Sequence, residues 1–130
     1  MTVTFLTDPP MLRDTQGCYR LISPLFAMVE GTCYVVPQQF RFDGASIPRA
    51  LWGVIGHPYL PNHVRPAALH DWMVRQPVTH PLSSTQAHDL FYHALRAEGV
   101  HPVRARLMWL AVRWFGPRFR SSLAKSPEGY

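Results

Sequence analysis

The chain has 130 residues, of which 47% are hydrophobic and 16% are charged, and this balance excludes an intrinsically disordered protein. Its formal net charge of +5 favours an anionic partner. The longest apolar run near the C-terminus, residues 107–112, is far too short to cross a bilayer, and no signal peptide is visible. We therefore expect a protein that is made in a cytoplasm and has no transmembrane segment.

Three short strands are predicted in the first third of the chain. Residues 19–22 and 32–36 are rich in β-branched and aromatic side chains, and Pro24 and Gly31 break the pattern between them. Residues 39–42 alternate polar and apolar side chains, which is typical of an edge strand.

Two cysteines, Cys18 and Cys33, flank a hairpin that the first two strands would form. They would then face each other across it. In a reducing cytoplasm we expect both to remain thiols.

A turn and the start of a helix follow the strands. Asp43-Gly44 is a turn signal, Ser46 is a favourable N-cap, and Pro48 suits the first turn of a helix that would run to Ile55. The free amides of this helix would point back toward Asp43 and would bind an anion or orient a side chain. A plain strand-to-helix connection needs the same residues, so both interpretations stay open.

The next predicted helix, residues 66–75, carries two ionisable side chains on a face that is otherwise apolar. Pro66 suits the first helical position, and Pro77 ends the helix. At about 100° per residue, His70 and Asp71 lie side by side on that face. Burying a charge is costly unless it is paired, so their position is unusual.

Two further helices are predicted. Ser83 and Gln86 match a capping box at the start of the first, and Gly99 would end it. The last helix would begin near Pro102 and end or bend at residues 116–117. Its predicted buried face consists of Val103, Leu107, Leu110, Ala111 and Trp114.

These elements predict a single α+β domain over residues 1–130. An N-terminal antiparallel β portion would pack on about four helices, with a central antiparallel helix hairpin. Residues 121–130 look like a loose tail.

The helix hairpin would bring together His70, Asp71 and Asp89, which are nearly equidistant from the centre of the connecting loop. His70 would act as a general base, and Asp89 would orient its ring. Asp71 would bind a hard cation that polarises a carbonyl group. A structural bridge between His70 and Asp89 is the alternative, because the crossing angle of the helices decides whether the two side chains meet.

Several runs of residues occur in a fixed order: Val35-Val36-Pro37, Phe40-Arg41-Phe42-Asp43-Gly44-Ala45-Ser46-Ile47-Pro48-Arg49, Ala67-Ala68-Leu69-His70-Asp71-Trp72, Ala87-His88-Asp89-Leu90-Phe91 and Gly99-Val100. Over residues 19–116 they resemble the DUF1353 family of uncharacterised bacteriophage and prophage proteins. The resemblance implies a phage origin, and hence synthesis in the cytoplasm of a bacterial host; whether the protein is associated with the virion stays open. Family members often have Tyr where this chain has Val74, and Ala where it has His88.

The helix pair is also similar to that of phospholipase A2, in which a His-Asp dipeptide faces an Asp and calcium lies at the first Asp. His70, Asp71 and Asp89 match those positions by spacing. The similarity implies Ca²⁺ at Asp71, with Asp43 in place of that family's calcium loop. The chain lacks that family's cysteine framework.

Three functions follow as alternatives. The first is a metal-assisted hydrolase of envelope lipid or of a cell-wall ester or amide, with His70 as base; in a variant of it, Ser46 is the nucleophile. The second is a non-catalytic virion component of the tail or neck, or a host-factor-binding protein, in which the His/Asp network is structural. The third is a transition-metal site formed by two His-Asp dipeptides, His70-Asp71 and His88-Asp89.

Basic residues concentrate in the last third of the chain. Residues 96–130 hold seven basic and two acidic side chains, so they account for the whole net charge of +5. We define the basic face as Arg104, Arg106, Arg113, Arg118 and Arg120. Together with the nearby Trp109, the basic face is suited to binding lipid headgroups, a nucleic-acid backbone or an acidic partner subunit. Phage structural proteins and the host envelope are the candidate partners. The alternative is that the arginine stems only cover apolar surface.

Overall fold

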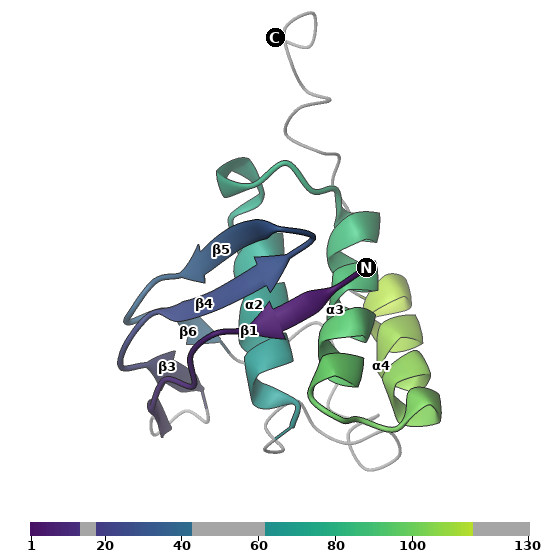
Figure 1. Cartoon of the computed structure of the whole chain (residues 1–130), viewed down its shortest axis with the longest axis horizontal. Coiled ribbons are helices and arrows are strands. Elements are labelled where there is room, and N and C mark those ends of the chain that lie inside the picture. Colours follow the sequence, from purple (N-terminus) through teal and green to yellow (C-terminus); the bar gives the residue numbers. More distant parts are fainter. Residues whose placement is uncertain (14–17, 43–61, 116–130) are drawn as a thin grey trace, which may run out of the picture.

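The computed structural model describes residues 1–13, 18–42 and 62–115, which form an α+β fold of short strands followed by helices (Figure 1). The strands are β1 (Val3–Phe5), β2 (Met11–Arg13), β3 (Tyr19–Leu21), β4 (Leu25–Val29), β5 (Thr32–Val36) and β6 (Arg41–Phe42). The helices are α2 (Val64–Arg75), the 3₁₀ helix η2 (Pro77–Thr79), α3 (Ser84–Ala97) and α4 (Pro102–Phe115). The helix predicted from Ser46 lies outside the described residues.

Two antiparallel sheets of three strands each form the β portion, in the orders β1-β4-β5 and β2-β3-β6. Strands β4 and β5 are joined by Glu30 and Gly31, whose φ angles are 51° and 81°. Positive φ at both central residues is what a tight hairpin turn requires. Glu30 adopts this positive φ, and its carboxylate accepts a hydrogen bond of 2.8 Å from the backbone N–H of Thr2. The turn thereby ties the start of β1 to the hairpin.

The predicted strands at 19–22 and 32–36 are present as β3 and β5, but their predicted pairing is wrong. β5 pairs with β4, a strand that the sequence reasoning missed because it treated Pro24 as a break with no strand after it. Cys33 therefore lies opposite Met28, and Cys18 and Cys33 do not form a disulfide.

The strand predicted over residues 39–42 is shorter and forms β6, whose Phe42 lies opposite Tyr19 with ring centroids 6.0 Å apart. β1 and β2 were also missed by the sequence reasoning. Each has only three residues, which is too few for a clear alternating pattern.

Among the described α-helices, α3 runs antiparallel to both α2 and α4 (Figure 1). α2 begins at Val64, two residues before Pro66, which still lies in the first turn, where its missing N–H costs no helical hydrogen bond. The capping box predicted for α3 is confirmed, since Ser83 accepts from the N–H of Gln86 and the Gln86 side chain accepts from the N–H of Ser83. None of the helices within residues 62–115 is long and apolar enough to cross a membrane.

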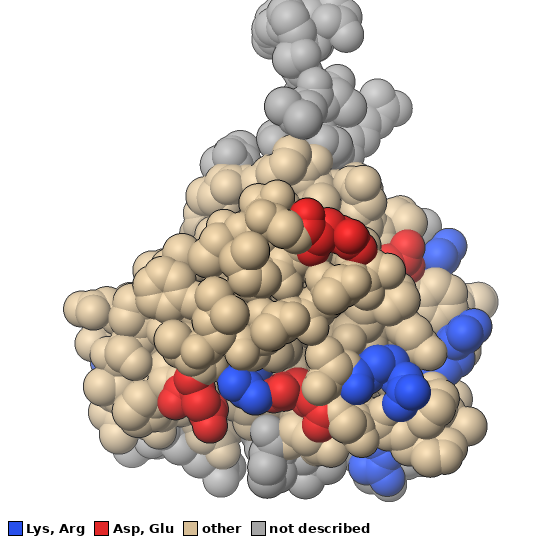
Figure 2. Space-filling view, in the orientation of Figure 1, with Lys and Arg blue, Asp and Glu red and all other residues tan. Residues whose placement is uncertain are grey.

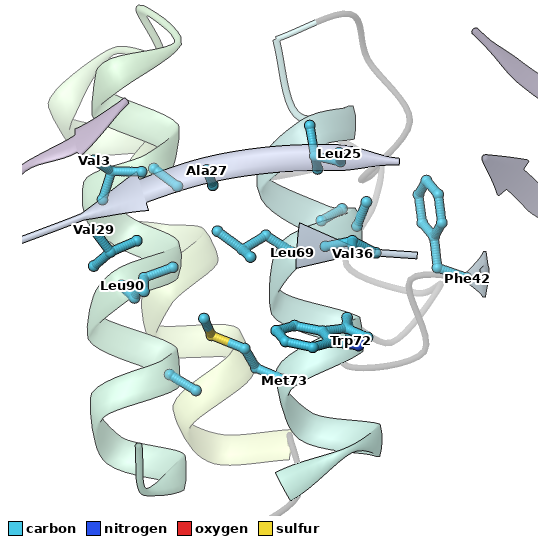
Figure 3. Packing of buried hydrophobic residues seen from close by; sticks show 14 of the residues in the cluster. Val3, Leu25, Ala27, Val29, Val36, Phe42, Leu69, Trp72, Met73 and Leu90 are labelled. Carbon is cyan, nitrogen blue, oxygen red and sulfur yellow. The ribbon is translucent and has the colours of Figure 1, made fainter. Parts of the chain in front are cut away.

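A layer of apolar side chains joins the β1-β4-β5 sheet to the helix hairpin. Leu25, Ala27 and Val29 of β4 are buried against a cluster that includes Leu69 of α2 and Leu90 of α3 (Figure 3). Arg65 fastens the edge of this layer: its guanidinium donates to both carboxylate oxygens of Glu98 at 2.7 Å and to the carbonyl of Thr7 at 3.0 Å. The start of α2, the end of α3 and the segment after β1 are thus held together.

A second apolar cluster fills the space between α3 and α4, and it corrects the predicted buried face of α4. The buried residues of α4 are Ala105, Met108, Ala111 and Val112. Of the predicted set only Ala111 is buried, whereas Val103, Leu107, Leu110 and Trp114 are exposed. Both sides of α4 carry apolar residues at helical spacing, so periodicity alone does not identify the side that faces α3.

Gly99 ends α3 with a φ of 87°, and the N–H groups of Gly99 and Val100 bond back to the carbonyls of Arg96 and Leu95. This is a Schellman motif, which requires a left-handed residue after the helix. No atom lies within 4 Å of a Cβ built on Gly99, so its replacement adds no clash. We predict that Gly99→Ala lowers the free energy of unfolding by about 1 kcal/mol through backbone strain alone.

Chemical denaturation measures this change. Gly99→Asn is the matched control, because Asn tolerates the left-handed region better than Ala does and should cost less. Equal losses for the two variants would contradict the explanation.

Candidate functional site

The structure describes three of the five residues predicted to form the site. His70 and Asp71 lie on α2, and Asp89 lies on α3. Ser46, the candidate nucleophile, and Asp43, the second candidate calcium ligand, lie outside the described residues. Their roles stay predictions.

His70 is buried in the interface between α2 and α3, where its side chain pairs with another histidine. His70 Nε2 lies 2.8 Å from Nδ1 of His88, and the ring centroids are 5.1 Å apart. Phe91 packs against the His70 ring at 4.9 Å between centroids. The residues His70 and His88 are only 1% and 3% exposed. One ring must donate its N–H and the other accept, so the two tautomers are linked.

The second ring nitrogen of His70 faces the neighbouring carboxylate. His70 Nδ1 lies 3.9 Å from Oδ1 of Asp71, and both side chains are buried. Both nitrogens of the predicted base are therefore directed at buried protein groups.

The predicted pairing of His70 with Asp89 is wrong. Oδ1 of Asp89 instead accepts a hydrogen bond of 2.7 Å from Nε1 of Trp109 on α4. Consecutive residues of a helix diverge by about 100°, so when His88 points at α2 its neighbour Asp89 points toward α4. Placing the loop centre one residue earlier, at 79, would have matched His70 with His88.

A third buried histidine, His80, lies in the loop between α2 and α3. Its Nδ1 accepts from the backbone N–H of Leu82 at 3.1 Å, so its Nε2 carries the proton that is donated to the carbonyl of Met73 at 2.7 Å. His80 therefore closes the end of α2 and shapes the loop. Its role is to hold the hairpin, and the sequence reasoning did not select it.

No group of three or more His, Cys, Asp or Glu side chains able to hold a metal occurs within residues 1–13, 18–42 and 62–115. The transition-metal interpretation places His70, Asp71, His88 and Asp89 around one ion. Asp89 points to Trp109 instead, so the described part of the chain does not bring these four together.

A pocket opens on the opposite side of α3, against α4. Its volume is about 250 Å³, and it is lined by Asp89, Tyr92, His93, Arg106 and Trp109. We call it the α3–α4 pocket. It joins a carboxylate, an imidazole, a guanidinium, a phenol and an indole in one partly open space, a mixture suited to binding a polar group.

Arginine and aromatic side chains alternate along the rim of the α3–α4 pocket. The Arg106 guanidinium lies 5.4 Å from the ring centroid of Tyr92 and 5.5 Å from that of Trp109. The Arg113 guanidinium lies 5.0 Å from the centroid of the same Trp109 ring. Such cation–π contacts hold the guanidinium groups in place on the surface. In Figure 2 blue side chains gather over the side of the molecule where α4 lies in Figure 1.

His93 is the titratable group of this pocket whose pKa is shifted. Burial lowers the pKa of His93 below its ordinary 6.5, and the positive N-terminus lowers it further, while Asp89 and Glu30 raise it. The unfolded chain therefore takes up the proton first as the pH falls. The contribution of His93 to the free energy of unfolding is complete above about pH 6.5 and declines below it.

We predict that Asp89→Asn lowers the pKa of His93 further, because the substitution removes a negative charge that favours the protonated ring. Asn keeps an oxygen that accepts from Trp109, so the local structure is preserved. NMR titration of the histidine ring protons measures the pKa, with His93→Gln assigning the signal. Asp8→Asn is the control and should leave the pKa of His93 unchanged; a shift of the same size there would contradict the local electrostatic cause.

A protein family described as "Protein of unknown function (DUF1353)" matches residues 19–112. Two uncharacterised proteins of Sinorhizobium fredii (strain NBRC 101917 / NGR234) are similar to the chain. Protein y4jT is 34% identical over 110 residues, which cover 85% of this chain and 30% of that protein. Protein y4iH is 31% identical over 103 residues, which cover 78% of this chain and 42% of that protein.

The chain thus spans less than half the length of either relative. No solved structure matches it significantly. Because the match to the family covers residues 19–112, which is well over half of the chain, the chain belongs to the DUF1353 family.

Proposed function

We propose that this protein is a non-catalytic binding component of phage or prophage origin, serving in the virion or engaging a host factor. In this proposal the buried His70–His88–Asp71 network is structural, and the surface of α3 and α4 makes the contact. The observation that carries it is the 2.8 Å contact between His70 Nε2 and His88 Nδ1 inside the helix interface.

A general base must place a ring nitrogen within reach of the proton that it removes. His70 is 1% exposed, and both its nitrogens face buried groups. The network instead satisfies polar groups in the core, which a folded protein needs wherever it buries them.

The alternative is the hydrolase, with His70 as base, Ser46 as nucleophile in one variant, and Ca²⁺ held by Asp71 and Asp43. It would act on envelope lipid or on a cell-wall ester or amide. Its support is the similarity of the His-Asp motif to phospholipase A2. The variants that test the binding proposal also test this one.

We predict that His70→Ala lowers the free energy of unfolding by roughly 3 kcal/mol, because it leaves a cavity and an unpaired buried nitrogen on His88. A double variant, His70→Leu/His88→Leu, should recover part of that loss, since it replaces both partners of the 2.8 Å contact by apolar groups that fill the interface. Chemical denaturation of the three proteins measures the differences.

The same proteins are assayed for hydrolysis of phospholipid and peptidoglycan, with and without Ca²⁺. The binding proposal expects no activity in the unsubstituted protein. Hydrolysis that is lost in His70→Ala while the variant remains folded would establish the hydrolase instead.

We further predict that Arg106→Gln/Arg113→Gln leaves the fold intact but weakens association with an anionic partner, because both arginines are exposed on α4, where both contact Trp109. The association should also weaken as salt rises, since exposed charges are screened beyond about 8 Å at physiological ionic strength. Binding to anionic vesicles, DNA and phage particles measures the effect.

The control is Arg20→Gln/Arg41→Gln, which removes the same charge from the β2-β3-β6 sheet. If neither arginine pair nor salt changes any association, the basic face is only a solvated surface.

A further inference from the structure

α4 exposes a line of apolar side chains that nothing in the described part of the chain covers. Val103 is 61% exposed, Leu107 39%, Leu110 40% and Trp114 75%. Their spacing of four, three and four residues is that of the a and d positions of a heptad repeat. We call these four residues the apolar seam.

The apolar seam lies on the side of α4 that faces away from α3. At about 100° per residue its four members fall within a sector of about 60°, nearly opposite the buried Ala105, Met108 and Val112. A stripe this narrow is typical of a helix-to-helix seam, whereas a helix face packed on a core is about 100° wide or more.

Arginines border the apolar seam. If Leu107 and Trp114 are a positions, Arg106 and Arg113 are the g positions and Arg104 is an e position. These are the places where charged side chains of two paired helices meet. Arg106 and Arg113 are held on the Trp109 ring at 5.5 and 5.0 Å, so they are positioned before a partner arrives.

We propose that the apolar seam docks an amphipathic helix of a partner protein, with aliphatic residues facing the seam and Glu or Asp facing the arginines. This rests on the proposed binding function and names the class of partner. The carboxylates would pair with guanidinium groups that lose little side-chain entropy, because the stack on Trp109 already orders them.

The arginines of α4 favour an acidic partner helix over a second copy of this chain. α4 holds three arginines and no acidic residue. Pairing two copies antiparallel would place Arg106 of one against Arg113 of the other, and no carboxylate would lie at either position. Like charges at these positions oppose pairing. DNA would satisfy the arginines but would leave the four apolar side chains unused.

The test uses two designed helical peptides of about three heptads with Leu and Ile at the a and d positions. One carries Glu at every e and g position and the other carries Lys. We expect the full chain to bind the Glu peptide, measured by isothermal titration calorimetry, and to bind the Lys peptide at least about tenfold more weakly.

Substitutions in the apolar seam then locate the site. Leu107→Gln/Leu110→Gln should weaken binding of the Glu peptide at least about tenfold, since Gln keeps the helix but removes the apolar contact. The matched control is Leu6→Gln/Leu12→Gln, which replaces leucines that are 55% and 60% exposed elsewhere. Circular dichroism checks that each variant is folded. Should the first double variant unfold, Val103→Gln/Trp114→Gln tests the two most exposed members of the seam.

Unchanged binding in the seam variants, equal binding of both peptides, or no binding at all would overturn the proposal. So would anionic vesicles bound through the same leucines in place of the Glu peptide, or a dimer in analytical ultracentrifugation that the seam variants dissociate. These outcomes are separate from hydrolysis, so the seam can fail while the non-catalytic proposal stands.

Discussion

The hydrogen bond between the buried rings of His70 and His88 fixes how α2 packs against α3. The direction of Asp89 and the position of the α3–α4 pocket follow from that contact. Two imidazoles placed in an apolar interface each need a partner, because an unpaired buried polar group costs about 1–3 kcal/mol. At 2.8 Å the rings satisfy each other, and they do so only when the helices have one rotation and one height. A hairpin packed by leucines alone would tolerate small slips between its helices. The pair therefore contributes specificity to the fold as well as stability.

That rotation determines where the next residue along α3 points. With His88 directed at α2, Asp89 is directed at α4, where it accepts the Trp109 N–H at 2.7 Å. Trp109 then contacts both Arg106 and Arg113, and Asp89, Arg106 and Trp109 line the α3–α4 pocket. The dipeptide His88-Asp89 thus connects a buried interface on one side of α3 with a charged surface on the other. Its two side chains serve different faces, which is why they do not act together in one site.

The same dipeptide shows what could and could not be predicted from the sequence. Helix ends followed from local chemistry: the capping box at Ser83 and the left-handed Gly99 were both identified correctly, because each depends on residues only a few positions apart. The site depended on the rotation of one helix against another, which no local pattern encodes, so Asp89 was assigned to His70 when His88 occupies that place. The strand β4 was missed for a related reason: Pro24 signals a break, but only the pairing with β5 shows that a strand follows it.

The amino-acid composition of α4 indicates an interface once it is known which side of the helix packs on α3. A helix that is apolar on two opposite sides has more apolar surface than one neighbour can bury, and such helices normally lie between two layers. α3 covers the side formed by Ala105, Met108 and Val112, which are buried in the cluster between the two helices. Leu107, Leu110 and Trp114 remain on the side that no described element reaches. Large apolar side chains contribute most to binding when a partner removes them from water, and arginines and tryptophan are the residues that most often dominate such contacts. The division of α4 into a buried apolar side for α3 and an exposed apolar side bordered by Arg106 and Arg113 is therefore the arrangement expected of a helix shared between its own fold and an interface.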